Sequence, residues 1–453
     1  MKLFEQICVG LLLLPAASLW SQVDNAPKQP VPAYGAADSS DVSDDRMSAP
    51  PPVSGQAYPT ALSSEERSNY LRGGVAFTAA YLDNAIVSAG GTPLSDVSYS
   101  LAPNIALDET TSRLHFLVSY APGFTFYRRT TSRDEVDHNA SIKFEYRLSP
   151  HLSFSARDDF QKSSSAFNQP DLASAGNVTG GPQSANFSVY APLAARLANA
   201  GNLGLAYQFS LNSMVGLGGS FSNLHYPDVS VNGGLYDSSS QGGLAYYSHR
   251  VTKTNYLGVT YQFQRLVAYP GAVIDVTHTQ AVLFFDTFNV TPRFSISLYG
   301  GPQYSDTTQL APLPSAHSWT PEAGASLGWQ SRLSSFALSY SHSISGGGGL
   351  TGAVQMDGSS ASVRQRMTKT LTGNLSGAYV QNKVLVASLL PGAIGSGHSI
   401  VGNASLQQQF GQQLRLELGY SRIHQNYADA ALLPNTNREY VSVSYQFSRP
   451  LGR

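Results

Sequence analysis

The sequence predicts an all-β protein: a transmembrane antiparallel up-and-down β-barrel of about 18 strands (16–18), with a disordered N-terminal tether. Apolar and polar residues alternate with period two between residues 73 and 448, which is the pattern of half-buried strands. Charged residues make up 13% of the 453 residues, against ~25% in soluble domains. A secretory signal at the N-terminus sends the mature chain out of the cytosol.

Residues 1–21 are predicted to be that signal peptide. Lys2 precedes the apolar stretch Ile7–Leu14, and Pro15 and several small residues follow it. The only cysteine, Cys8, would be removed with the signal, so no disulfide or thiol chemistry is expected in the mature chain. Beyond this segment no run approaches the ~18 apolar residues of a membrane-spanning helix, and any membrane insertion must use strands.

Residues 22–72 are predicted to form a Pro-rich periplasmic tether. Residues 22–58 consist mainly of Pro, Ala, Ser and Asp and carry too few bulky apolar side chains to form an ordered core. Ser63–Glu66 (SSEE) is a capping box, which predicts one short helix over Arg67–Leu71. The acidic residues of the tether lack the spacing of a calcium loop, so we expect no metal there.

The barrel itself is assigned to residues 73–448. Leu414, Leu416 and Leu418 alternate with Arg415 and Glu417, and many other segments alternate apolar residues with Gly, Ser, Thr, Gln or Asn. A soluble β-sandwich would carry more charges on its outer faces. A polar, water-filled lumen inside an apolar outer band with aromatic residues near strand ends explains the pattern better.

Connection lengths predict the topology. Eighteen strands are expected, from 73–82 to 439–448, and short turns such as 149–151 and 367–370 alternate with long segments such as 163–200, 226–240 and 426–438. In outer-membrane barrels the turns are periplasmic and the longer loops extracellular. An even strand number therefore places both termini on the periplasmic side, and residues 449–453 form a periplasmic tail.

Charged side chains gather at two predicted lumenal walls that flank the closure of the barrel. A cationic stripe facing a neutral wall would attract anionic or polar solutes into a pore. The alternative is that these charges pair across neighbouring strands and stiffen the wall. The predicted pore-lining residues are Arg113, Lys143, Glu145, Arg147, Arg157, Arg364, Arg366, Arg415 and Glu417. Asp159 is predicted to face inward beside them.

Catalytic and metal-binding patterns are weak. Gly324-Ala325-Ser326-Leu327-Gly328 matches G-x-S-x-G, but it lies inside a predicted strand rather than at a strand-to-helix turn. The ten histidines show no metal-ligand spacing, and no cofactor is expected. A surface hydrolase would draw on Asp158, Asp159, His225 and His424. Asp158, however, has the parity of the lipid-facing residues. Either the strand has left the membrane at this point or a bulge shifts its alternation by one residue. We therefore predict that the protein is not an enzyme.

The signal peptide, the alternating strands and the aromatic-ended last strand YVSVSYQF resemble Gram-negative outer-membrane β-barrel proteins of the porin type. The resemblance covers residues 73–448 and implies an outer-membrane location and passive or weakly selective diffusion of small hydrophilic solutes, with anionic solutes as an open alternative. In that class the last residue is an aromatic that is recognised during assembly, whereas Phe447 is followed by six more residues. The mature chain has too few residues before the first strand for the plug domain of a TonB-dependent receptor.

Other functions and partners are kept as alternatives. One is a component of a polysaccharide or solute export complex, whose periplasmic partner would dock on residues 22–58, and another is a surface-exposed barrel hydrolase. The expected partners are outer-membrane lipid and small hydrophilic solutes, with a homotrimer as one candidate assembly. A formal charge of -1 without a basic block argues against nucleic acid.

Overall fold

The computed structural model describes most of the barrel region. The described residues are 69–86, 94–163, 195–227, 235–269, 274–291, 293–309, 315–346, 352–385, 396–427 and 435–451. The predicted signal peptide, and the predicted tether up to residue 68, lie outside these ranges. Within them, no helix has the length and hydropathy of a membrane-spanning segment.

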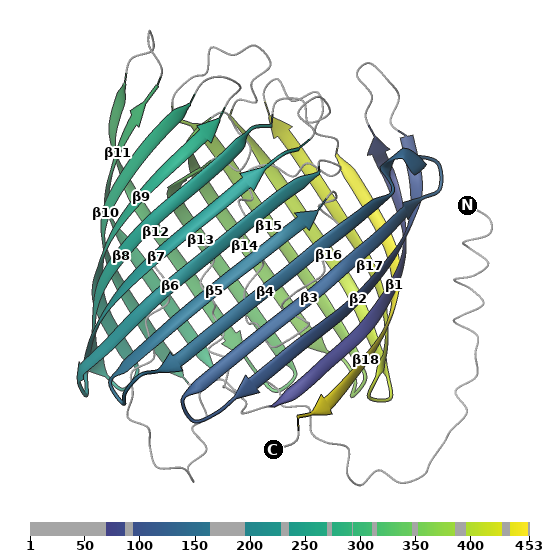
Figure 1. The fold of residues 1–453 in the computed structure, drawn as a ribbon, viewed down its shortest axis with the longest axis horizontal. Helices are drawn as coiled ribbons and strands as arrows, with labels where there is room; N and C mark the ends of the chain where they lie inside the picture. Colours follow the sequence, from purple (N-terminus) through teal and green to yellow (C-terminus); the bar gives the residue numbers. More distant parts are fainter. Residues whose placement is uncertain are drawn as a thin grey trace. The chain divides into compact units, whose positions relative to one another are not determined.

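Eighteen antiparallel strands form a single closed sheet (Figure 1). Their bounds are β1 (Tyr70–Ile86), β2 (Leu94–Thr110), β3 (Leu114–Tyr127), β4 (Glu135–Arg147), β5 (Leu152–Ser163), β6 (Arg196–Ser210), β7 (Ser213–His225), β8 (Asp237–Thr252), β9 (Asn255–Tyr269), β10 (Asp275–Thr291), β11 (Phe294–Thr308), β12 (Ala316–Gln330), β13 (Ser334–Ser345), β14 (Val354–Arg366), β15 (Leu371–Val384), β16 (Gly397–Phe410), β17 (Leu414–Tyr427) and β18 (Thr436–Pro450). One short 3-10 helix, η1 (Thr131–Arg133), lies between β3 and β4.

Closure of the barrel is direct, because β1 pairs with both β2 and β18. Each of the other strands pairs with its neighbours in the sequence, which is the up-and-down order. The predicted fold class and strand number are therefore confirmed. A closed sheet leaves no unpaired edge, as a strand structure that spans a bilayer requires.

The ends of the barrel segment differ slightly from the prediction. β1 begins at Tyr70, so Tyr70 and Leu71, which the capping box assigned to a short helix, belong to a strand. Their backbones pair with β18 and β2, and this pairing stabilises the extended form over a helical turn. β18 continues to Pro450, two residues into the predicted tail.

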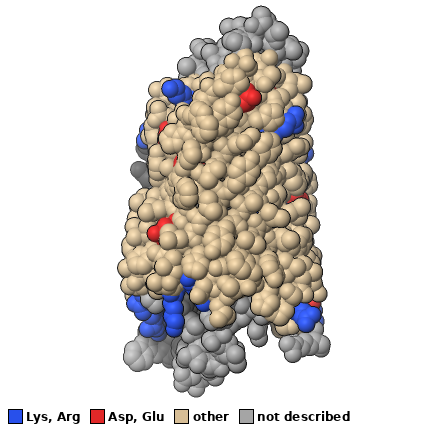
Figure 2. Space-filling model, turned by 90° about the vertical axis from the view of Figure 1, so that its left-hand side faces the viewer, with Lys and Arg blue, Asp and Glu red and all other residues tan. Residues whose placement is uncertain are grey.

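The two faces of the wall differ in the expected way. On β18, Val443, Tyr445 and Phe447 are exposed on the outside, whereas Ser442 and Ser444 face inward. Thr78 on β1 donates to the Ser442 hydroxyl across the closure at 2.8 Å, which fixes this inward parity. Figure 2 shows the resulting outer surface, a broad band almost free of charged side chains with charges towards its two ends. Such a band is what a membrane-spanning barrel presents to lipid.

The two ends of the barrel are unlike. At one end, called here the turn end, eight connections of two to four residues join the strands, and Asn69 and Leu451 lie beside each other with the Leu451 N–H donating to the Asn69 carbonyl. At the other end, called here the loop end, the connections contain five to 32 residues. The predicted alternation of short turns and long connections is therefore present, although much of the long connections lies outside the described residues.

Asp158 on β5 faces outward. The pairing of β4 with β5 runs without a shift in register from His138 to Arg147, and Asp158 lies opposite the outward-facing Ile142. The bulge considered as an explanation for its parity is therefore absent from this pairing. Asp286 on β10 has the same outward parity, between Phe284 and Phe288.

Candidate functional site: the barrel lumen

The lumenal face is the candidate functional site, because period-two strands in a closed barrel place every second side chain inside. All nine predicted pore-lining residues have the inward parity of their strands or lie in a turn beside them. Arg113 is in the turn between β2 and β3, and Arg147 and Arg366 are the last residues of β4 and β14. The other six lie within β4, β5, β14 and β17. They form two groups with different surroundings.

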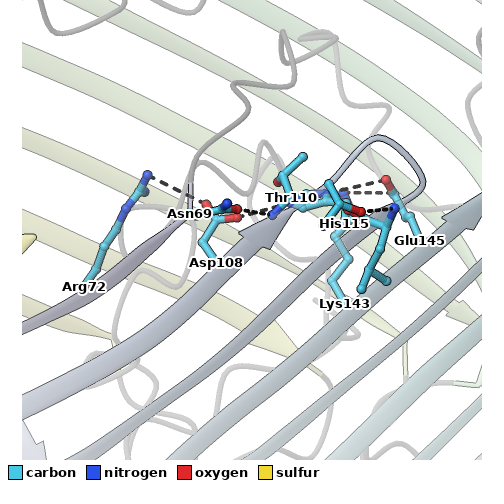
Figure 3. Close-up of polar contacts among 9 residues, drawn as sticks. Asn69, Arg72, Asp108, Thr110, His115, Lys143 and Glu145 are labelled. Atoms are coloured by element: carbon cyan, nitrogen blue, oxygen red, sulfur yellow. Dashed lines mark hydrogen bonds and ion pairs between the residues drawn. The ribbon is translucent and has the colours of Figure 1, made fainter. Parts of the chain in front are cut away.

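The first group, on β1 to β4, is a connected row of charges near the turn end (Figure 3). The Lys143 ammonium is 2.9 Å from the Glu145 carboxylate, and Glu145 is also 3.5 Å from the His115 ring. His115 lies 3.5 Å from Asp108, which in turn lies 3.7 Å from Arg72. Each carboxylate of the row thus lies between two basic side chains.

The same pairing occurs on β5. The Arg157 guanidinium donates to both carboxylate oxygens of Asp159, at 2.7 and 3.3 Å. This two-point contact holds the planar guanidinium in one orientation. On β3 to β5 the contacts therefore support the stiffening interpretation of the predicted charges.

The second group, on β14 to β17, has different partners. Arg366 donates from Nη2 to the Lys369 carbonyl at 2.9 Å and so closes the turn that follows β14. Arg364 is exposed and has the inward parity of its strand, and Arg415 has the same parity on β17. Among the described residues, no carboxylate lies within 4.0 Å of the Arg415 guanidinium.

Glu417, two residues from Arg415, is bound by neutral donors. Gln407 on β16 donates to its Oε2 at 2.9 Å, and the Tyr440 hydroxyl on β18 donates to its Oε1 at 2.7 Å. The buried Arg438 guanidinium lies 5.1 Å from the centre of the Tyr440 ring, close enough for a cation–π contact. Arg438 and Tyr440 escaped the sequence-based prediction because their role depends on the register between β17 and β18.

A buried carboxylate also lies in the wall that was expected to be neutral. Glu322 on β12 is almost fully buried and accepts hydrogen bonds from Gln262 on β9, at 2.6 Å, and from Gln303 on β11, at 2.9 Å. The wall predicted to consist mostly of small and neutral polar residues thus also contains a buried carboxylate. The signal was present, since Glu322 has the parity of the inward-facing Gly324 and Ser326.

Aromatic side chains on the inner wall cover glycines of the paired strand. A Cβ atom at Gly324 would lie 2.2 Å from the Tyr299 ring, and one at Gly419 would lie 2.1 Å from the Tyr440 ring. In both pairs the two residues lie directly opposite each other in the register. Gly216 with Tyr246 and Gly258 with Phe285 repeat the arrangement. The glycines let these rings lie against the backbone, as in aromatic rescue of a strand glycine.

At the loop end an apolar cluster links distant parts of the wall. Leu224 of β7 and Tyr226 and Leu235 of the following connection pack in one buried cluster with Val354 of β14 and Tyr427 of β17. β7 and β14 are seven strands apart in the sheet, so the cluster brings side chains together across the barrel. The cluster therefore fills part of the barrel interior at this level.

The residues considered for catalysis do not assemble. Ser326 lies in the regular pairing of β12, opposite Ser297 and Ser339, rather than at the strand-to-helix turn that the G-x-S-x-G motif requires. Asp159 binds Arg157, and His225 contacts Asp237 at 2.6 Å. His424 lies beside His398, at a ring distance of 6.2 Å. Within the described ranges, no group of three or more His, Cys, Asp or Glu side chains is arranged to hold a metal ion.

Comparisons with known proteins give similarity at the level of the fold. No protein-family model and no curated protein matches the chain. Among solved structures, the FrpB iron transporter of Neisseria meningitidis (F3-3 variant) is 12% identical, with a TM-score of 0.42, over 83% of this chain and 66% of that chain. This chain thus spans slightly less than two thirds of FrpB. OpdQ of Pseudomonas aeruginosa is 11% identical over 84% of this chain and 98% of that chain, with a TM-score of 0.40.

OccAB4 of Acinetobacter baumannii is similar to the same extent, at 10% identity and a TM-score of 0.40, over 84% of this chain and 99% of that chain. Identities and TM-scores this low do not bear on function. The assignment of the fold therefore rests on the strand order, the closure and the two-faced wall of the chain itself. By these features the chain has a closed, eighteen-stranded antiparallel barrel fold.

Proposed function

We propose that the protein is a porin-like channel of the outer membrane, through which small hydrophilic solutes diffuse passively or with weak selectivity. The observation that carries the proposal is the closed barrel with an apolar outer band and a polar, charged inner face. A lumen lined by charged and amide side chains favours hydrated solutes over apolar ones. The homotrimer and a periplasmic partner on residues 22–58 stay predictions.

Conductance in a planar bilayer tests the channel directly. The refolded protein should open discrete, ohmic channels in KCl. Replacing Leu235 by Ser should raise the conductance of each channel, because a polar residue loosens the apolar cluster that fills part of the interior at the loop end. A heat-dependent shift on a gel shows that the barrel is folded. If the folded wild type and the folded Leu235→Ser variant both fail to conduct, the protein is not a channel.

The finer hypothesis is a preference for anions, set by cations of the wall formed by β14 to β17. Replacing Arg415 by Gln removes a cation that has no carboxylate within 4.0 Å among the described residues, so the reversal potential in a KCl gradient should shift towards cations. The shift should shrink between 0.1 M and 1 M salt, as the Debye length falls from ~10 Å to ~3 Å.

A matched control is available on the other side of the closure, on β4. The double variant Lys143→Gln, Glu145→Gln removes an ion pair of 2.9 Å and leaves the net charge unchanged, so it should move the reversal potential little. An unchanged reversal potential in the folded Arg415→Gln variant would refute the anion hypothesis while leaving the channel itself in place.

The proposed orientation puts the turn end and both termini in the periplasm. The motivation is the difference in connection length between the two ends. A cysteine introduced at the exposed Ser315, at the loop end just before β12, should react with an impermeant maleimide on intact cells. One at the exposed Thr254, in the turn between β8 and β9, should react only after permeabilisation, and the opposite result would reverse the orientation.

A further inference from the structure

The turn end carries an arc of cations that the channel function does not use. Four successive turns, between β8 and β9 and onwards to the turn between β14 and β15, each contain one basic residue and no acidic one. The four residues are Lys253, Arg293, Arg332 and Lys369, and all are exposed. Figure 2 shows Lys and Arg side chains gathered at the lower end of the barrel, beneath the uncharged band.

These four cations differ from the arginines just inside them. Arg250 donates to the Asn212 side chain at 3.0 Å and to the Leu211 carbonyl at 3.1 Å, and Arg366 donates to the Lys369 carbonyl. Arg250 and Arg366 therefore stabilise the turns. By contrast, no ion pair is formed by any of the four arc cations with another described residue.

Bulky apolar side chains are exposed in or beside the same turns. Val251, Leu333 and Met367 are each more than half exposed, at 54%, 53% and 57%, and each is within two residues of an arc cation. If only water surrounded these turns, the exposure of three large apolar side chains would be unfavourable. The surface of a bilayer suits both kinds of side chain, because the apolar part enters the acyl region while Lys and Arg extend to the headgroups.

We propose that the arc of turns from β8 to β15 binds the phosphate groups of anionic phospholipids in the leaflet at the turn end. Adjacent turns are two strands apart, or about 10 Å, so neighbouring cations contact neighbouring headgroups rather than one compact ligand. Among the described residues, the carboxylate in the turn-end half of these strands is that of Asp286, on the outer face of β10 and seven residues before Arg293. The proposal rests on the membrane insertion proposed above and is independent of solute passage.

Lipid selectivity measured with spin-labelled lipids tests the proposal. In phosphatidylcholine vesicles, the wild-type barrel should restrict the motion of labelled phosphatidylglycerol several-fold more than that of labelled phosphatidylcholine, and high salt should reduce this preference. The variant with all four arc cations replaced by Gln should lose most of the preference, with a fall of about threefold or more. A wild-type barrel without any preference for phosphatidylglycerol would overturn the proposal.

A matched control removes four outward-facing, exposed cations from the half of the wall next to the loop end. Its substitutions are Lys162→Gln, Arg265→Gln, Lys383→Gln and Arg422→Gln. This control should keep most of the preference, and an equal loss in both variants would contradict a site at the turn end. Displacement of the labelled lipid by inorganic phosphate would also contradict it, because that result indicates a general anion site.

Folding and conduction are followed in the same samples. Heat-dependent migration on gels shows whether each variant forms the barrel, and the pair Lys253→Gln, Arg332→Gln replaces the fourfold variant if that one does not fold. A loss of lipid preference with unchanged conductance supports the lipid site. If no form of the protein conducts, the channel proposal fails, but the measured lipid preference still tests the lipid site.

Discussion

Replacing Val443 by Arg should lower the free energy of unfolding, by about 2 to 4 kcal/mol if the residue lies at the midplane of the membrane and by less towards its edges, because the side chain projects into hydrocarbon. Val443 is the central residue of β18 and is exposed on the outer face. Unfolding by urea in lipid vesicles, followed by tryptophan fluorescence, measures the change. The same substitution at Leu416 on β17 should have a similar effect, since Leu416 lies opposite Val443 in the register.

Ser442 provides the control one residue away. Its side chain faces the lumen and lies opposite Glu417, so an arginine there meets water and a carboxylate instead of lipid. We expect Ser442→Arg to change the free energy of unfolding far less than Val443→Arg does. Equal effects at the two positions would contradict the two-faced wall.

Replacing Gly324 by Ala should destabilise the barrel by about 1 to 3 kcal/mol, the usual cost of overpacking. The new methyl group would lie 2.2 Å from the Tyr299 ring. That ring cannot move away freely, because it is buried in a cluster with Ala281, Leu283 and Phe285. The same urea titration measures the loss.

Gly402 is the matched control for this substitution. A Cβ atom at Gly402 meets no other atom within 4 Å, so Gly402→Ala should be neutral or slightly stabilising. The double variant Gly324→Ala, Tyr299→Leu should recover part of the lost stability, because the smaller side chain makes room for the methyl group. If Gly324→Ala costs no more than Gly402→Ala, the close ring contact is not a constraint on folding.

Local pattern was sufficient to predict the strands. Period-two alternation and short polar turns indicate the strands from the sequence, and β1 and β18 contain the predicted ranges 73–82 and 439–448. The reason is physical: in a barrel wall each residue faces either lipid or lumen according to its parity alone, so parity needs no knowledge of distant contacts. At Tyr70 and Leu71 the local helix signal failed, because pairing with β2 and β18 outweighed it.

Parity also placed eight of the nine candidate residues on the inner face, with Arg113 in the turn between β2 and β3, but it does not predict their partners. Whether a lumenal charge is compensated depends on which residues lie beside it along and across the strands: Lys143 meets Glu145, whereas Arg415 has no such carboxylate among the described residues. The hydrogen bond from Gln262 to Glu322 joins β9 to β12, and these two residues are 60 positions apart in the sequence.

The sequence by itself therefore determined the fold class, the strand number and the side of the wall on which each residue lies, because these follow from alternation within single strands. Only the tertiary structure decided which charges are paired, which glycines are covered by rings, and where side chains meet across the barrel interior. Those features depend on the register between neighbouring strands and on contacts across the barrel, such as that of Tyr226 with the cluster containing Val354, and neither is encoded in the pattern of any one strand.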